Sequence, residues 1–348
     1  MQRLLENIHD HHLLGDIKYT ALMPSEYVEK WQKRLPNISI KAADQKWYSF
    51  SEQWSLYRLL KALKPDLVHF TMPQQPFLYN RPAITTIHDT TLIRFTNYGD
   101  KNKVIYNIKK QIFTQLVKVV LGRAKRVLVP TEFVKNDITD YFGNRYRSTI
   151  TVTYEAGEIP SVDPEPLQAF ANKRFFFFVG NAFPYKNVKR TILAHQQLVQ
   201  EHPDVHLLLA GKKDFFYTEL EQFTIDNAIP NVHFLGFVSD AEKRWLFQNA
   251  VAFVGASKSE GFCVPILEAM QEKTVSILSN ASCQPEVGGD AALYFNPDST
   301  DELADAMKKI LTNKRLRAGL IAKGEEQVKK FSWKKMTDET VAIYKEYL

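Results

Sequence analysis

Short apolar runs alternate with amphipathic stretches along most of the 348-residue chain. A short, continuous apolar run is typical of a strand that is buried on both faces of a sheet. An apolar stripe at helical spacing between two such runs is typical of a crossover helix. Because strands that alternate with helices form parallel sheets, the pattern predicts an α/β protein made of doubly wound units.

The predicted strands fall into two groups, one in each half of the chain. In the first half they are residues 67–70, 83–87, 126–129 and 150–154, and in the second half 175–179, 205–210, 232–235, 251–254, 275–278 and 292–295. Helical patterns lie between them at 103–122, 132–142, 189–202, 241–249 and 301–312.

Residues 157–166 separate the two groups of strands and hold three prolines, a composition typical of a linker. We therefore expect one Rossmann-like domain over 1–160 and a second over 161–330, with the ligand site in the cleft between them. The segment 331–348 has an N-cap candidate at Ser332 followed by an apolar helical face, and this predicts a C-terminal helix.

The composition is that of an ordinary globular protein, with 45% hydrophobic residues. The two cysteines, Cys263 and Cys283, have a spacing that suits neither a metal site nor a redox pair, which favours a reducing compartment. Neither a signal-like apolar core near the start nor a run of about 18 apolar residues occurs. We expect a cytoplasmic protein that is neither exported nor embedded in a membrane.

The net charge of +6 is unevenly distributed. Residues 1–160 hold 23 Lys and Arg against 15 Asp and Glu, and the remainder holds 22 against 24, so the two parts carry +8 and −2. Between Lys101 and Arg126 eight basic residues occur without an acid. Such a face suits nucleic acid, an anionic membrane surface or a phosphorylated acceptor, and it is equally the pattern of a solvated helix face.

The most informative stretch is 257–270, SKSEGFCVPILEAM. A strand ending near Val254 leads into a loop of small residues and then into a helix marked by Pro265 in its first turn. Free amides at such a helix start hold anions, and Gly261 allows close backbone approach. Glu260 and Glu268 would frame one pocket for a ligand with both phosphate and sugar hydroxyls. The alternative is that both are surface acids near a helix start.

Further motifs accompany this stretch, and their order and spacing make the match specific. They are 184–187 (PYKN), 208–212 (LLAGK), 234–239 (FLGFVS), the Glu-x7-Glu pair Glu260 and Glu268, and 285–292 (PEVGGDAA). Together they resemble the donor half of retaining GT-B glycosyltransferases of family 4. The resemblance covers roughly residues 66–348 and is strongest over 175–312.

The resemblance implies two Rossmann-like domains facing a central cleft. Domain 1–160 would bind the acceptor, domain 161–330 would bind a nucleotide-sugar donor, and the last helix would cross back onto the first domain. It also implies a hexose of mannose or glucose type, moved from a GDP- or UDP-linked donor to a glycan or lipid-linked acceptor in polysaccharide biosynthesis.

The resemblance also assigns roles to individual residues. Glu268 would hydrogen-bond the ribose, Glu260 the transferred sugar, and Lys186 the phosphates. The stretch 86–89 (TIHD) matches the strand-end His of the family, so His88 would reach the donor sugar or the acceptor hydroxyl. The catalytic set is then Glu260, Lys186 and His88. The further donor-binding positions are Gly180, Asn181, Gly211, Lys212, Phe237, Val238, Gly261, Phe262 and Cys263.

The expected chemistry needs no metal and no cofactor besides the nucleotide sugar. In a retaining transfer of this kind the leaving diphosphate accepts the acceptor's proton, while an oxocarbenium-like transition state develops. Lys186 and the helix start before Pro265 would stabilise the phosphate charge. The chain has no Asp-x-Asp motif for a divalent ion.

Two departures from the family favour alternatives. Asn181 stands where many relatives have an arginine, and residues 1–8 are typical of the helix that follows the first strand in relatives. A non-catalytic accessory subunit is therefore one alternative, and a nucleotide-sugar epimerase or a phosphorylase on the same fold is another. As partners we expect the donor, the acceptor and an anionic membrane surface at 101–126, and no nucleic acid.

Overall fold

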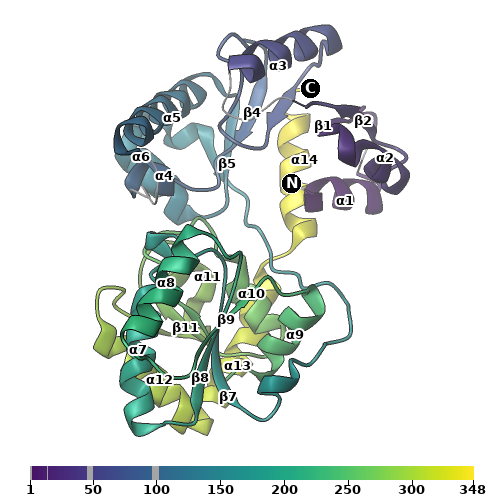
Figure 1. Ribbon diagram of the computed structural model, residues 1–348. Helices are drawn as coiled ribbons and strands as arrows, with labels where there is room; N and C mark the ends of the chain where they lie inside the picture. Colours follow the sequence, from purple (N-terminus) through teal and green to yellow (C-terminus); the bar gives the residue numbers. More distant parts are fainter. Residues whose placement is uncertain (1, 14, 45–49, 96–101) are drawn as a thin grey trace.

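The computed structural model describes residues 2–13, 15–44, 50–95 and 102–348. The chain folds into two α/β domains, which Figure 1 shows one above the other. The predicted strands all overlap observed ones, to within two residues at either end.

The first domain is formed mainly by the first half of the chain (Figure 1). Its strands are β1 (Thr20–Met23), β2 (Ser39–Ala42), β3 (Val68–Phe70), β4 (Ala83–Thr86), β5 (Arg126–Val129) and β6 (Ile150–Val152). Its helices are α1 (Gln2–Asp10), α2 (Ser25–Arg34), α3 (Phe50–Leu63), α4 (Thr91–Arg94), α5 (Lys103–Arg123) and α6 (Glu132–Phe142), with the 3₁₀ turn η1 (Asn144–Thr149).

The strands of the first domain form two parallel sheets. One has the order β3-β4-β5-β6, and the other pairs β1 with β2. The sequence pattern missed β1 and β2, because only Ile40 among their residues is buried, the apolar run of β1 is three residues long, and β2 has no such run. Backbone hydrogen bonds between the two strands and packing against neighbouring helices stabilise them. These contacts join distant residues, so the local sequence pattern does not predict them.

The second domain contains a single parallel sheet with helices on both faces. Its strands are β7 (Arg174–Val179), β8 (Val205–Ala210), β9 (Val232–Gly236), β10 (Ala252–Gly255), β11 (Ser276–Ser279) and β12 (Ala292–Phe295). Its helices are α7 (Val188–Glu201), α8 (Phe215–Asp226), α9 (Asp240–Asn249), α10 (Val264–Gln271), α11 (Gln284–Gly288), α12 (Thr300–Thr312) and α13 (Lys314–Gln327), with the 3₁₀ turns η2 (Gln168–Phe170), η3 (Pro184–Lys186), η4 (Gly289–Ala291) and η5 (Val328–Lys330).

The order of that sheet, β9-β8-β7-β10-β11-β12, is the doubly wound order of a Rossmann fold. Strand β7 lies in its middle, and its phenylalanines alternate between the two cores. Phe176 and Phe178 pack on one face, and Phe175 and Phe177 on the other, all of them buried. The prediction of a strand buried on both faces is confirmed.

The last helix, α14 (Trp333–Lys345), packs against the first domain. Its Met336, Val341 and Tyr344 share a buried core with Leu4 and Ile8 of α1, and Figure 1 shows α14 beside α1. The proline-containing segment between the domains lies along α10, where the Gln271 amide donates a hydrogen bond to the carbonyl of Gly157. The chain therefore connects the domains twice, once through this segment and once through α14.

Candidate active site between the domains

The loops that follow β4 and β10 meet where the two domains touch. A Cβ atom on residue 261 would overlap the carbonyl oxygen of His88, so only glycine allows this approach. The Thr131 hydroxyl donates a hydrogen bond of 2.9 Å to the carbonyl of Gly261, and the hydroxyls of Thr91 and Ser259 lie 3.0 Å apart. Close approach of a ligand to Gly261 stays a prediction, whereas the structure shows Gly261 as a contact point between the domains.

Glu260 lies in this loop and is paired with Lys186 from η3. The Lys186 ammonium and the Ser257 hydroxyl both donate to the same carboxylate oxygen, the latter at 2.7 Å. Burial disfavours the charge of Lys186, but the Glu260 carboxylate outweighs burial and raises the pKa of Lys186 above its ordinary value. The Lys186 side chain is therefore cationic at neutral pH. An ammonium has three donors, so two remain for a phosphate.

Glu268 lies on α10, which begins just after the same loop. Cys263 precedes the helix in a left-handed conformation (φ 66°), and Pro265 lies in the first turn, as the sequence predicts. The Glu268 side chain is 9% exposed, and its carboxylate accepts a hydrogen bond of 2.9 Å from the Lys243 ammonium. Burial raises the pKa of Glu268, and Lys243 opposes that rise.

His88 faces the cleft at the end of β4. Its Nδ1 lies 3.0 Å from a Glu155 carboxylate oxygen, and its Nε2 lies 3.1 Å from the Thr71 carbonyl oxygen. Both partners accept, so both ring nitrogens donate when both bonds are made. Burial lowers the pKa of His88, but the hydrogen bond and charge of Glu155 outweigh burial and the net pKa is raised. The geometry supports a cationic imidazole.

The comparisons with known proteins cover nearly the whole chain. Residues 1–155 match the family model described as Glycosyltransferase Family 4, and residues 162–327 match the one described as Glycosyl transferases group 1. The O-antigen chain mannosyltransferase RfbU of Salmonella typhimurium is 30% identical over 266 residues, which are 76% of this chain and 70% of that protein. The chain belongs to glycosyltransferase family 4.

Other relatives and solved structures agree with this assignment. The glycosyltransferase is 29% identical over 275 residues to the O-antigen chain mannosyltransferase B of Escherichia coli, covering 76% of this chain and 70% of that protein. Its fold matches that of HepE from Anabaena in complex with UDP-glucose, with a TM-score of 0.76 and 15% identity over 100% of this chain and 95% of that one. WaaG, a glycosyltransferase involved in lipopolysaccharide biosynthesis, matches with a TM-score of 0.72 and 14% identity over 98% and 95%. The GT-B fold is therefore confirmed.

The other predicted donor-binding residues of the glycosyltransferase lie near the ends of β7, β8 and β9. A side chain on Gly211 would overlap the carbonyl of Gly180 and the hydroxyl of Tyr217, so this glycine is required by packing. The Asn181 amide oxygen accepts a bond of 3.3 Å from the amide of Phe183 and shapes the turn before η3. Lys212 and Phe237 are exposed, and Val238 is half-buried, so contact with a nucleotide stays a prediction for each.

The glycosyltransferase has a cavity of about 110 Å³ beside His88. It is lined by residues of both the first domain and α14, namely Leu4, His69, Thr86, His88, Leu128, Val129, Pro130, Thr153, Glu155, Trp333, Met336 and Thr340. His69 is fixed there by Tyr344 at 2.6 Å and Thr86 at 2.8 Å, and burial lowers its pKa to about 3. His69 is therefore a neutral residue that ties α14 to the sheet.

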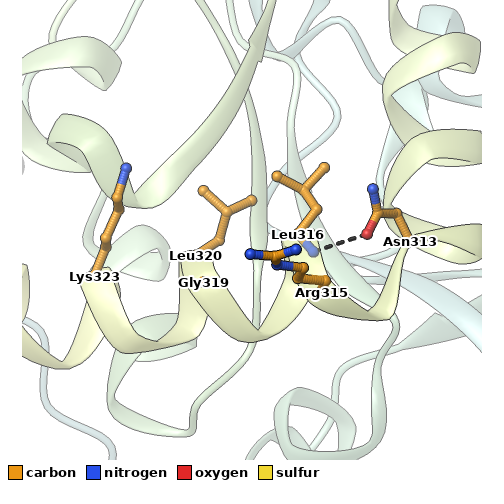
Figure 2. Close-up of a pocket in the computed structure, with 6 residues that line it drawn as sticks. All are labelled: Asn313, Arg315, Leu316, Gly319, Leu320 and Lys323. Carbon is orange, nitrogen blue, oxygen red and sulfur yellow. Dashed lines mark hydrogen bonds between the residues drawn. The ribbon is translucent and has the colours of Figure 1, made fainter.

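A wider cavity of about 350 Å³ lies over one helix, α13, away from these residues. Figure 2 shows its lining side chains along that helix, from Asn313 to Lys323. None of them belongs to the predicted site, so we assign no role to this surface.

Within the described part of the chain, no three His, Cys, Asp or Glu side chains gather as metal ligands. No described helix has the length and apolar character needed to cross a bilayer. Metal independence stays a prediction.

Three further residues of the candidate site are identified only from the structure. Lys243, Glu155 and Glu286 contact Glu268, His88 and the start of α6 respectively. Glu286 lies in the quoted 285–292 motif, which signalled its importance without its role. Lys243 and Glu155 carry no motif, because their partners are distant in sequence.

Proposed function

We propose that this glycosyltransferase moves a hexose of mannose or glucose type from a nucleoside diphosphate sugar to a glycan or lipid-linked acceptor, with retention of anomeric configuration and without a metal. The observation that carries the proposal is the Lys186–Glu260 ion pair, which joins η3 to the loop after β10. The next residue of that loop, Gly261, meets the carbonyl of His88 just after β4. A cation beside a helix start suits a diphosphate, and a carboxylate beside it suits sugar hydroxyls.

The names of relatives support the sugar and the donor. RfbU and the Escherichia coli O-antigen protein are mannosyltransferases, and the phosphatidyl-myo-inositol mannosyltransferase of Mycolicibacterium smegmatis is 30% identical over 164 residues, 46% of this chain and 42% of that protein. HepE has been solved with UDP-glucose. A mannose donor is therefore our first choice and a glucose donor the second.

Different residues of the site bind the nucleotide, stabilise the diphosphate and position the sugar. Glu268 accepts hydrogen bonds from the ribose, and the backbone at 237–238 meets the base. Lys186 and the amides at the start of α10 stabilise the diphosphate as its bond to the sugar breaks. The leaving phosphate oxygen takes the acceptor's proton as the acceptor oxygen bonds to the anomeric carbon on the same face. Glu260 and His88 position the sugar.

The first domain supplies a surface for an acceptor that is attached to lipid. Lys101 lies outside the described residues, but the first half of α5 exposes Val104, Ile105, Ile108 and Ile112, each by 53–66%, beside the exposed Lys109. Exposed apolar side chains next to lysines fit an anionic membrane surface. We include peripheral contact through α5 in the proposal.

The test is a thermal-shift screen of the wild type and Glu268→Ala against UDP, GDP, ADP and their sugar conjugates, because a ligand of the native state raises its melting temperature. We expect nucleotides of one base family to raise the melting temperature of the wild type but not that of Glu268→Ala. In a transfer assay with an α-linked donor, we expect the product to carry an α-linkage. Product formed without acceptor would support the epimerase, and a need for free phosphate the phosphorylase. A well-folded protein that responds to no nucleotide would support the accessory subunit and contradict the proposal.

A further inference from the structure

Glu268 and Lys243 form an ion pair between two neighbouring helices of the second domain. Lys243 lies on α9 and Glu268 on α10, and the ammonium nitrogen is 2.9 Å from the Glu268 Oε1 atom. Both side chains are largely removed from water, with 18% and 9% of their surfaces exposed. The described residues give Glu268 no second ion pair. Lys243 also lies 3.7 Å from Asp240, on the first turn of its own helix.

A carboxylate in this position needs a cation to remain charged. Burial alone drives a carboxyl group towards its neutral form, and Asp240 pushes in the same direction through its own negative charge. The Cys263 thiol also lies near Glu268, but burial raises the pKa of this thiol, so it is neutral and does not help to keep Glu268 charged. Lys243 is thus the charge that opposes protonation of Glu268.

We propose that Lys243 is a positioning residue for Glu268, which holds one carboxylate oxygen in place and keeps the group ionised so that the other oxygen accepts the ribose hydroxyls of the donor. This inference rests on the proposed function, in which Glu268 binds the ribose. An ionised carboxylate is a stronger acceptor than a carboxylic acid. The contribution of Lys243 is therefore largest where an unaided Glu268 would take up a proton.

A neighbouring pair supplies a matched control for a merely structural role. Arg244, the next residue on α9, pairs with Glu272 at the end of α10 at 3.1 Å. Both pairs connect the same two helices, and both acids are nearly buried, with Glu272 10% exposed. Loss of Arg244 removes a connection between α9 and α10 but leaves Lys243 and Glu268 together.

The experiment measures the dissociation constants of GDP and UDP by calorimetry between pH 5.5 and 8. It compares the wild type with Lys243→Met, Lys243→Arg and Arg244→Met. We expect Lys243→Met to weaken binding of the preferred nucleotide about tenfold at pH 6 and distinctly less at pH 8, since removal of the cation lets Glu268 protonate at a higher pH. Lys243→Arg keeps the charge and should restore most of the affinity, and Arg244→Met should follow the pH profile of the wild type.

The proposal would be overturned if the dissociation constant of Lys243→Met changed with pH in parallel with that of the wild type. It would also be overturned if Arg244→Met showed the same change with pH as Lys243→Met. If Lys243→Met does not melt cooperatively, Lys243→Gln replaces it with the same expectation. Glu268→Gln separates this inference from the proposed function. If Glu268→Gln binds nucleotide as the wild type does, the ribose role itself is wrong. If Glu268→Gln binds weakly while Lys243→Met and Lys243→Gln show no pH effect, only the role of Lys243 is wrong.

Discussion

The carboxylate of Glu286 in the second domain accepts a hydrogen bond of 2.9 Å from the backbone amide of Phe133 in the first. Its other oxygen accepts from the amide of Glu132 at 2.8 Å. These are the first two residues of α6, so the carboxylate satisfies amides that the helix leaves unpaired and lies at the positive end of the helix dipole. A cap that crosses between domains holds them together in the arrangement that brings His88 to Gly261.

Removal of this cap should loosen the domains without unfolding either one. We expect Glu286→Ala to lower kcat/KM by about tenfold, roughly the effect of losing charge-assisted hydrogen bonds worth 1–2 kcal/mol. Small-angle X-ray scattering should show a larger radius of gyration for Glu286→Ala than for the wild type. The control is Glu242→Ala, which removes the capping box of α9 inside the second domain and should leave the radius unchanged. An unaltered radius in Glu286→Ala would contradict the role.

A methyl group on residue 261 should have a larger effect on the same contact. Gly261→Ala forces its Cβ into the carbonyl of His88, a backbone atom that no side-chain rotation moves aside. We expect kcat/KM to fall by about 10² or more, while the melting temperature changes little, because both domain cores are intact. Gly122→Ala is the control, since a Cβ there meets nothing within 4 Å. Equal kinetics for the two variants would refute the importance of this approach.

Loss of the Lys186 charge should affect the chemical step more than binding of the donor. Because Lys186 acts on charge that develops on the leaving phosphate, Lys186→Met should lower kcat by about 10² with a smaller change in donor KM. Steady-state kinetics with the donor that the thermal-shift screen identifies measure both constants. Lys186→Arg keeps a cation beside Glu260 and should retain more activity. A Lys186→Met variant with the turnover of the wild type would rule out this role.

The pair His88–Glu155 should make stability depend on pH. The folded protein raises the pKa of His88 above its ordinary value of 6.5, so the pair stabilises the fold fully below that value and loses this effect as pH rises through the raised pKa. His88→Asn should therefore lower the melting temperature more at pH 5.5 than at pH 8.5. Melting curves of both proteins at the two values measure the difference, and a larger loss at pH 8.5 would contradict a cationic His88.

The exposed face of α5 should bind vesicles that carry negative charge. Ile108→Asp combined with Ile112→Asp removes apolar contact and adds charge that such a surface repels. We expect the wild type to sediment with phosphatidylglycerol vesicles and not with phosphatidylcholine vesicles, and the double variant to remain in the supernatant. Ile225→Asp, at a 66% exposed position on α8 in the second domain, is the control and should sediment as the wild type does. Equal sedimentation of the double variant would exclude α5 as the contact.

Elements whose signal is local are predictable from the amino-acid sequence. The run Phe175–Phe178 predicts a central strand because a strand buried on both faces needs apolar residues at every position. Pro265 after a loop of small residues predicts the start of α10 for an equally local reason. The family motifs predict that Glu260 and Glu268 share one donor site, and this stays a prediction.

The side chains that meet across the candidate site come from distant parts of the chain and are identified only from the folded structure. Lys243 and Glu268 are 25 residues apart, and Glu286 and Glu132 are 154 apart, so no spacing rule relates them. Strands β1 and β2 were missed because their stability comes from pairing with each other and from packing, not from an apolar period of their own. Periodicity reports how one element divides its faces between core and water, whereas contacts between elements depend on how those faces pack together, which the whole fold fixes.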